Sequence, residues 1–153
     1  MIIDTERLII YPISNDEIKI LISKEKDPEM IKAYSEMLEG CVKHPEERLF
    51  YTVWIMETKD NSVRIGDLCF KGINDDGMVE IGYGLYDGFC GNGYMTEAVT
   101  ALTAWVINQS GVTRIEAETE PGNIASQRVL EKAGFVPSGI MGEEGPRFIC
   151  LGK

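Results

Sequence analysis

A glycine-rich segment at residues 88–93 is the first part of the sequence whose residue types and spacing could bind a ligand. It reads Gly-Phe-Cys-Gly-Asn-Gly and separates a strand-like apolar run from a segment with helical spacing. The first turn of a helix has unpaired backbone N–H groups and a partial positive charge, which favour a bound phosphate. Glycines at 91 and 93 allow successive N–H groups to converge without interference from a Cβ atom. An anion-binding loop and a structural turn are both consistent with this spacing.

Two common phosphate-binding motifs are excluded. No Gly-Lys-Ser/Thr follows the glycines, so the segment is not a Walker loop. A dinucleotide fingerprint begun at Gly91 would need glycine where Thr96 stands. A nucleotide-phosphate binder of another kind stays a third hypothesis, with only the glycine cluster in its favour.

Carboxylates are the side chains most suited to moving protons near this loop. Glu116, Glu118 and Glu120 alternate along a predicted strand and therefore share one of its faces. Glu80 is a further candidate, near the start of the strand that precedes the loop. The alternative is that these carboxylates are solvated strand-face residues. Cys90 is not predicted to be a nucleophile, because no histidine lies near it in the sequence to act as its base.

Hydrophobic periodicity and turn residues divide the chain into alternating groups of strands and helices. The predicted strands are residues 7–11, 49–58, 63–71, 78–86, 114–119, 135–136 and 147–151. The predicted helices are one capped at residue 14 or 15, one from 28 that is ended by Gly40, then 94–109 and 123–133, with 41–48 as a loop. The order β-α-α-β-β-β-α-β-α-β-β predicts an α+β (mixed α/β) fold with a central mixed sheet flanked by helices. Residues 1–153 are predicted to form a single domain.

Composition restricts the partners. Fifteen basic and twenty-five acidic residues give a net charge of -10, which argues against nucleic-acid binding and favours cationic partners. No apolar stretch approaches membrane-spanning length and no signal segment is recognisable, so no membrane association is predicted and a cytoplasmic location is expected. The single histidine and four cysteines have no metal-site spacing, and no metal is expected.

Three separated motifs resemble the GNAT acetyltransferases, and within them the RimJ/RimL-like branch of ribosomal-protein and related N-terminal acetyltransferases. They are EIGY at 80–83, CGNGYMTEA at 90–98, and NIAS at 123–126 with LEKAGF at 130–135. The opening TERL at 5–8 is also similar to that branch. The motifs occur in the family's order over nearly the whole chain. The resemblance implies the GNAT fold, with a mostly antiparallel sheet.

The resemblance implies acetyl-coenzyme A (acetyl-CoA) as the donor substrate. In the family, a Q/R-x-x-G-x-G/A loop holds the pyrophosphate through backbone N–H groups, and here Gly88 replaces the glutamine or arginine. That difference removes a side-chain contact and leaves the backbone contacts. The implied cofactor-binding residues are Ile81, Gly82, Tyr83, Gly88, Cys90, Gly91, Asn92, Gly93, Tyr94, Met95, Thr96, Asn123 and Ser126.

The resemblance also suggests catalytic residues. Glu118 lies five residues before Asn123, which is the spacing of the general-base glutamate in ribosomal alanine acetyltransferases, and Glu80 is the other candidate base. Many members have a tyrosine that acts as the general acid, and the matching position here is Leu130. Ser126 matches a serine that protonates the thiolate in the RimL-like branch, or it only contacts the cofactor.

The predicted function is transfer of acetyl from acetyl-CoA directly to a primary amine, either a protein N-terminal α-amine or a small cationic amine. The alternative is a non-catalytic CoA-binding regulatory module on the same fold, which the missing tyrosine suggests. The sequence leaves the acceptor amine and the oligomeric state open, with a homodimer among the alternatives.

Overall fold

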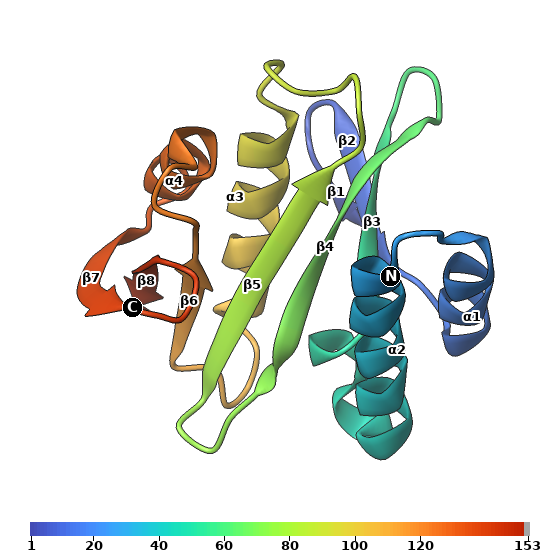
Figure 1. Cartoon of the computed structure of the whole chain (residues 1–153), viewed down its shortest axis with the longest axis horizontal. Coiled ribbons are helices and arrows are strands. Elements are labelled where there is room, and N and C mark those ends of the chain that lie inside the picture. The colour runs from blue at the N-terminus through green and yellow to red at the C-terminus, as the bar shows by residue number, and fades with distance from the viewer. Residues whose placement is uncertain (152–153) are drawn as a thin grey trace.

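Short apolar runs pair into one sheet that extends across the molecule. The structure is a computed structural model that describes residues 1–151, and eight strands of this part of the chain form the sheet (Figure 1). The strands are β1 (Ile3–Asp4), β2 (Leu8–Pro12), β3 (Val53–Thr58), β4 (Arg64–Ile73), β5 (Met78–Leu85), β6 (Arg114–Glu118), β7 (Val136–Met141) and β8 (Pro146–Leu151). The helices are α1 (Asn15–Lys24), α2 (Pro28–Lys43), α3 (Tyr94–Val106) and α4 (Ile124–Lys132), with a 3-10 helix, η1 (Pro45–Phe50), after α2.

The sheet is mixed, as predicted, and mostly antiparallel. Its strand order is β1-β2-β3-β4-β5-β6-β8-β7, and β5 and β6 are the parallel neighbours. Their pairing is short, running from Met78 opposite Arg114 to Glu80 opposite Glu116. Along residues 81–85, β5 has no partner on its β6 side within the described chain. The backbone N–H and C=O groups on that side are therefore available to a ligand.

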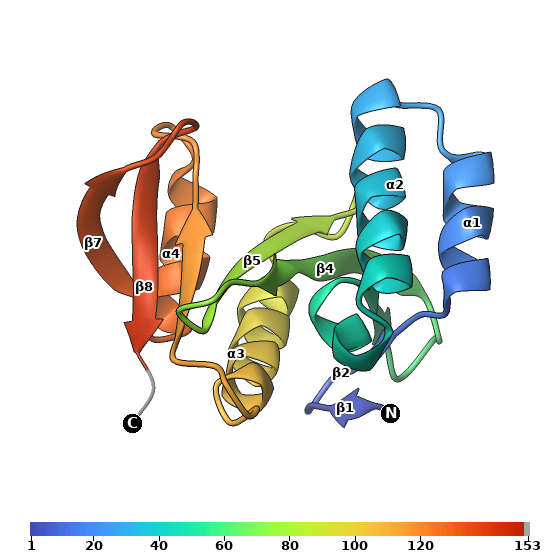
Figure 2. The same cartoon turned by 90° about the horizontal axis from the view of Figure 1, so that it is seen from below.

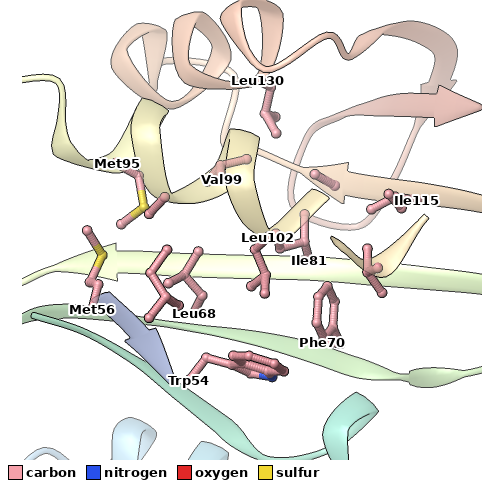
Figure 3. Close-up of a cluster of buried hydrophobic side chains, with 14 of the residues drawn as sticks. Trp54, Met56, Leu68, Phe70, Ile81, Met95, Val99, Leu102, Ile115 and Leu130 are labelled. Atoms are coloured by element: carbon pink, nitrogen blue, oxygen red, sulfur yellow. The ribbon is translucent and has the colours of Figure 1, made fainter. Parts of the chain in front are cut away.

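The larger hydrophobic core lies between the sheet and α3. Met95, Val99 and Leu102 repeat at helical spacing along α3 and point toward the sheet (Figure 3). They pack with Trp54 of β3 and Phe70 of β4, both of which are almost fully buried. The structure therefore has a helix where one was predicted, and this stripe is its buried face.

Helices α1 and α2 lie on the other face of the β4–β5 region (Figure 2). A second apolar cluster, which includes Ile18, Tyr34 and Val53, joins these helices to that face. The Tyr34 hydroxyl also donates a hydrogen bond of 2.8 Å to Asp67 of β4. No helix within residues 1–151 is long and apolar enough to cross a membrane.

The predicted boundaries between residues 40 and 53 were wrong, whereas β3 ends at Thr58 as predicted. α2 continues past Gly40, so the predicted loop at 41–48 contains the last residues of α2 and part of η1. The strand that was predicted from residue 49 begins at Val53. Leu49 instead lies in η1, where its carbonyl accepts a 3.1 Å hydrogen bond from the Trp54 indole N–H.

Three other elements differ from the prediction. The two-residue strand β1 is too short to give a periodic pattern. α3 ends at Val106 rather than at 109, because Asn108 and Gln109 turn their side-chain amides back onto the last carbonyls of the helix. β7 runs beyond the predicted residues 135–136, and its Pro137 is tolerated because β7 is an edge strand.

Gly40 lies inside α2 because Tyr51 packs directly against it. A Cβ atom built on Gly40 would lie 2.5 Å from Cδ1 of Tyr51. The Tyr51 ring stacks in turn on His44, with ring centroids 4.5 Å apart. The glycine therefore allows close packing and does not end the helix.

We expect Gly40→Ala to destabilise the protein, although alanine is the better helix former by about 1 kcal/mol. The added Cβ would overlap the Tyr51 ring, and overpacking of this kind costs about 1–3 kcal/mol. Urea unfolding followed by circular dichroism measures the free energy of unfolding. Gly122→Ala is the control, because a Cβ there meets nothing within 4 Å. A Gly40→Ala variant as stable as the wild type would contradict the packing role.

Candidate active site

A cavity of about 480 Å³ lies between the end of β5, the glycine loop, the start of α3, and α4. It brings together residues from all three sequence motifs. The predicted binding residues that line it are Tyr83, Cys90, Gly91, Gly93, Tyr94, Met95, Thr96, Asn123 and Ser126.

Four predicted binding residues do not line this cavity. The Ile81 side chain is 3% exposed and packs in the main core, and Gly82 has no side chain to offer. Gly88 has a left-handed φ of 93°, and the Asn92 carbonyl accepts a hydrogen bond from Arg7. Contacts of Ile81, Gly82 and Gly88 with a ligand in the cavity would come from their backbone.

The glycine loop leaves the first turn of α3 open. Gly91 and Gly93 have φ values of 83° and 78°, a left-handed conformation that favours glycine. Gly93 is the N-cap of α3, and no side chain among the described residues caps this helix end. The unpaired N–H groups of the first turn therefore face the loop region with their partial positive charge. This arrangement fits an anion such as a phosphate.

Arg7 of the N-terminal segment braces the loop. Its backbone N–H and its Nε each donate a 2.8 Å hydrogen bond to the Glu97 carboxylate in the first turn of α3. Its Nη1 donates a 2.9 Å hydrogen bond to the carbonyl of Asn92. The guanidinium also lies 4.4 Å from the ring centroid of Tyr94. One arginine thus fixes the loop and the helix start relative to each other.

Tyr83 and Ser126 form a polar pair inside the cavity. The Tyr83 hydroxyl lies 2.8 Å from Ser126 Oγ. Asn123 holds Ser126 in place, because its Oδ1 accepts a 3.0 Å hydrogen bond from the Ser126 backbone N–H and caps α4. Burial raises the pKa of Tyr83, so its phenol stays protonated at neutral pH. The pair can therefore donate a proton or a hydrogen bond within the cavity.

Arg128 and Lys132 also line the cavity, and neither was predicted from the sequence. They are four residues apart on α4 and therefore lie on one face of the helix. They bring positive charge to a site on an otherwise acidic protein. Their spacing from Ala125, at three and seven residues along the helix, was the available signal.

Both candidate bases are bound by Arg147 of β8. Its Nη2 lies 2.8 Å from Glu80 Oε1, and its Nη1 lies 2.8 Å from Glu118 Oε1. Glu116 accepts from the same guanidinium, with a distance of 3.0 Å to Nη2. The four side chains are between 11% and 18% exposed, so the network is largely buried. Glu120, predicted on the same face, is exposed and lies beyond the end of β6.

These contacts keep the glutamates ionised. Burial alone would raise the pKa of Glu80, but hydrogen bonds from Lys71 and Arg147 outweigh it and lower that pKa. The pKa of Glu118 is lowered mainly by a hydrogen bond from the Glu144 backbone N–H, and further by Arg147. Gly142 makes room for the Glu118 carboxylate, since a Cβ there would collide with it. A carboxylate with a lowered pKa attracts cations and is a weak proton acceptor.

Comparisons with known proteins identify relatives of the chain. The family model of the acetyltransferase (GNAT) domain matches residues 4–136. The uncharacterized N-acetyltransferase YjdG of Bacillus subtilis is 39% identical over 84 residues, which cover 54% of this chain and 50% of that protein. This alignment thus spans about half the length of YjdG. The uncharacterized N-acetyltransferase YoaA of Bacillus subtilis is 27% identical over 153 residues, covering 92% of this chain and 85% of that protein.

A solved structure with a similar fold is RimL, a ribosomal L7/L12 alpha-N-protein acetyltransferase in complex with coenzyme A. It is 17% identical, with a TM-score of 0.76, and the match covers 99% of this chain and 98% of RimL. At this identity the likeness concerns the fold, including the mixed sheet and its flanking helices.

We expect Arg147→Met to destabilise the protein by about 1–3 kcal/mol at neutral pH, because three partly buried carboxylates lose their shared cation, while Glu80 keeps Lys71 and Glu116 keeps Arg114. In the wild type, the lowered pKa values stabilise the fold above the ordinary glutamate pKa of about 4.3, and this contribution is lost as pH falls through the lowered values. The variant's glutamates protonate more readily, so its deficit should shrink toward about pH 4.

Urea unfolding at both pH values measures this difference. Arg64→Met is the matched control, because its ion pair with Glu17 at 3.7 Å is about half exposed and contributes little. A deficit that stays constant with pH would contradict the electrostatic role of Arg147.

Proposed function

The chain belongs to the GNAT acetyltransferase family, and from this premise we propose that it transfers the acetyl group of acetyl-CoA directly to a primary amine. The observation that carries the proposal is the cavity in which the glycine loop, the free edge of β5 and the start of α4 meet. A protein N-terminal α-amine and a small cationic amine are the two acceptor classes that we propose.

The donor fits the residues of this cavity. The pyrophosphate would lie at the glycine loop, against the uncapped N–H groups of α3. Arg128 and Lys132 would supply positive charge for its phosphates. The pantetheine arm, which carries amide groups, would pair with the unpaired backbone of β5 between residues 81 and 85. Asn123 and Ser126 line the same route.

The proposed acetyl transfer needs no covalent enzyme intermediate, and its bonds and protons balance as follows. The acceptor ammonium first loses a proton, and the nitrogen lone pair then attacks the thioester carbonyl carbon. A C–N bond forms, the C–S bond breaks, and the second amine proton leaves. The thiolate takes up one proton and is released as free CoA. One proton is therefore released overall for each ammonium that is acetylated.

We assign the thiolate proton to the Tyr83–Ser126 pair. The two hydroxyl oxygens lie 2.8 Å apart and either can be the donor. In the proposed reaction Tyr83, protonated at neutral pH, donates to Ser126 Oγ, and the serine proton then faces the sulfur. The position of the family's acid tyrosine cannot take this role, because leucine has no proton to donate there, and Leu130 is fully buried in the core (Figure 3). Ser126 is then the proton donor, and Tyr83 positions it.

We assign deprotonation of the amine to Glu118, acting through water, in preference to Glu80. Glu80 contacts two cations, Lys71 and Arg147, whereas Glu118 contacts Arg147 and one backbone N–H. The less neutralised carboxylate attracts an ammonium more strongly. Its lowered pKa limits it to a relay role rather than direct and complete proton transfer.

An acceptor panel with thiol detection tests the proposed function. We expect acetyl-CoA to release free thiol only when a primary amine is added, and mass spectrometry to find the acetylated amine. CoA binding without thiol release for any peptide or small amine would instead support a CoA-binding module without catalysis. Tighter calorimetric binding of ATP than of CoA would favour a nucleotide binder.

Glu118→Gln tests the proton relay. We expect kcat/KM to fall by about 100-fold at neutral pH, because general acid–base catalysis contributes at least this much. The loss should shrink as pH rises and the acceptor becomes neutral without help. Glu120→Gln is the control, because that side chain is exposed beyond the end of β6. A Glu118→Gln enzyme with the wild-type rate from about pH 6 to 9 would remove Glu118 from the mechanism.

A further inference from the structure

A second cavity, of about 390 Å³, lies between α2 and β4. The β4 residues Cys69 and Lys71 form one wall of this cavity. Both lie over Gly82 of β5, since a Cβ built on Gly82 would be 3.4 Å from Cys69 Sγ and 3.8 Å from Lys71 Cε. The next residue, Tyr83, lines the donor cavity. The two cavities therefore flank consecutive residues of one strand, on opposite faces of the sheet.

The sheet is open at this point. The β5–β6 pairing ends at Glu80 opposite Glu116, immediately before Gly82 and Tyr83. Beyond that pair, no ladder among residues 1–151 joins β5 to β6. A thioester held at this part of β5 could thus be approached from the α2 side while the rest of the donor stays on the α3 side.

Three of the four charged residues that line the second cavity are in ion pairs. Lys43 lies 2.7 Å from Glu39, and Lys71 lies 2.8 Å from Glu80. Glu36, the other charged residue of the lining, is exposed at the rim. The acidic character of the whole protein therefore does not extend to the walls of this cavity.

The remaining walls are apolar. They are formed by Ala33 and Met37 of α2, the Tyr51 ring and Cys69 of β4, while the Phe70 side chain points to the main core on the α3 side. Burial raises the pKa of the Cys69 thiol to about 11, so this side chain is uncharged at neutral pH. Apolar walls with few polar groups, in a volume of a few hundred Å³, are typical of small-molecule sites.

We propose that this cavity holds the body of the acceptor, and that the acceptor is a small primary amine attached to an apolar group. The inference rests on the proposed acetyl transfer and narrows its acceptor. The amine nitrogen lies toward Gly82 and the thioester, while the apolar group replaces water between α2 and β4. A second positive charge on the acceptor body would lose its hydration against these walls. Among the described residues, no unpaired buried carboxylate lines the cavity to form an ion pair with that charge.

A series of linear alkylamines, from ethylamine to hexylamine, tests the proposal with acetyl-CoA and thiol detection. We expect kcat/KM to rise about two- to fourfold for each added methylene until the cavity is filled, as burial of CH₂ groups predicts. Diamines of the same length should be poorer acceptors than the monoamines.

Ala33→Phe fills the cavity and should flatten this dependence on chain length. Ser35→Phe is the matched control, because Ser35 is an exposed residue of the same helix outside the cavity. Calorimetric CoA binding verifies that the donor site of each variant is intact. An Ala33→Phe enzyme with the wild-type slope, or a preference for diamines or peptides, would overturn this inference and leave the acetyl transfer standing. Absence of thiol release with every amine would overturn the proposed function and this inference with it.

Discussion

The early end of the parallel pairing between β5 and β6 is the constraint on which the site depends. Hydrogen bonding stops at Glu80 and Glu116, so the rest of β5 keeps an unpaired edge in the middle of a sheet. An interior strand with free backbone groups needs other contacts to hold its neighbours in place. Arg147 provides them, because its guanidinium joins Glu80 of β5 and Glu118 of β6 from the adjacent β8. Ion pairs thus replace the missing ladder where the strands separate.

Charged side chains have two different roles around β5: some hold strands together as ion pairs, and others line a cavity. Most carboxylates near the separated strands are bound by cations, which fixes the geometry of the sheet and lowers their proton affinity. The cavity proposed for the donor instead gathers Arg128, Lys132 and an uncapped helix start. Positive charge is therefore concentrated on one face of β5, and the cavity on the other face is lined by two acidic and two basic residues besides its apolar walls. The net charge of the chain describes neither environment.

The sequence was sufficient where the signal is local. The apolar stripe of α3 and the glycines before it follow from helical spacing and from the residues themselves, and the order of motifs gave the fold. The role of Gly40 could not be read, since it depends on Tyr51, which approaches α2 only after the chain has turned through η1. The ion pairs of Arg147 with the glutamates likewise depend on the position of β8 beside β6, which is a property of strand order. The hydrophobic periodicity of one segment does not say which distant segment will pack beside it.

The brace between Arg7 and the glycine loop would link the proposed donor binding to the folding of the chain. Arg7 contacts Asn92 and Glu97 across 85 and 90 residues of sequence, and contacts of such separation form slowly. The brace is complete only when the segment before β2 and the start of α3 have come together. Any ligand that prefers the braced loop stabilises both ends of this connection together, through linkage between binding and folding. Donor occupancy would then act as a folding cofactor for the N-terminal strands, which lie far from the phosphate in sequence.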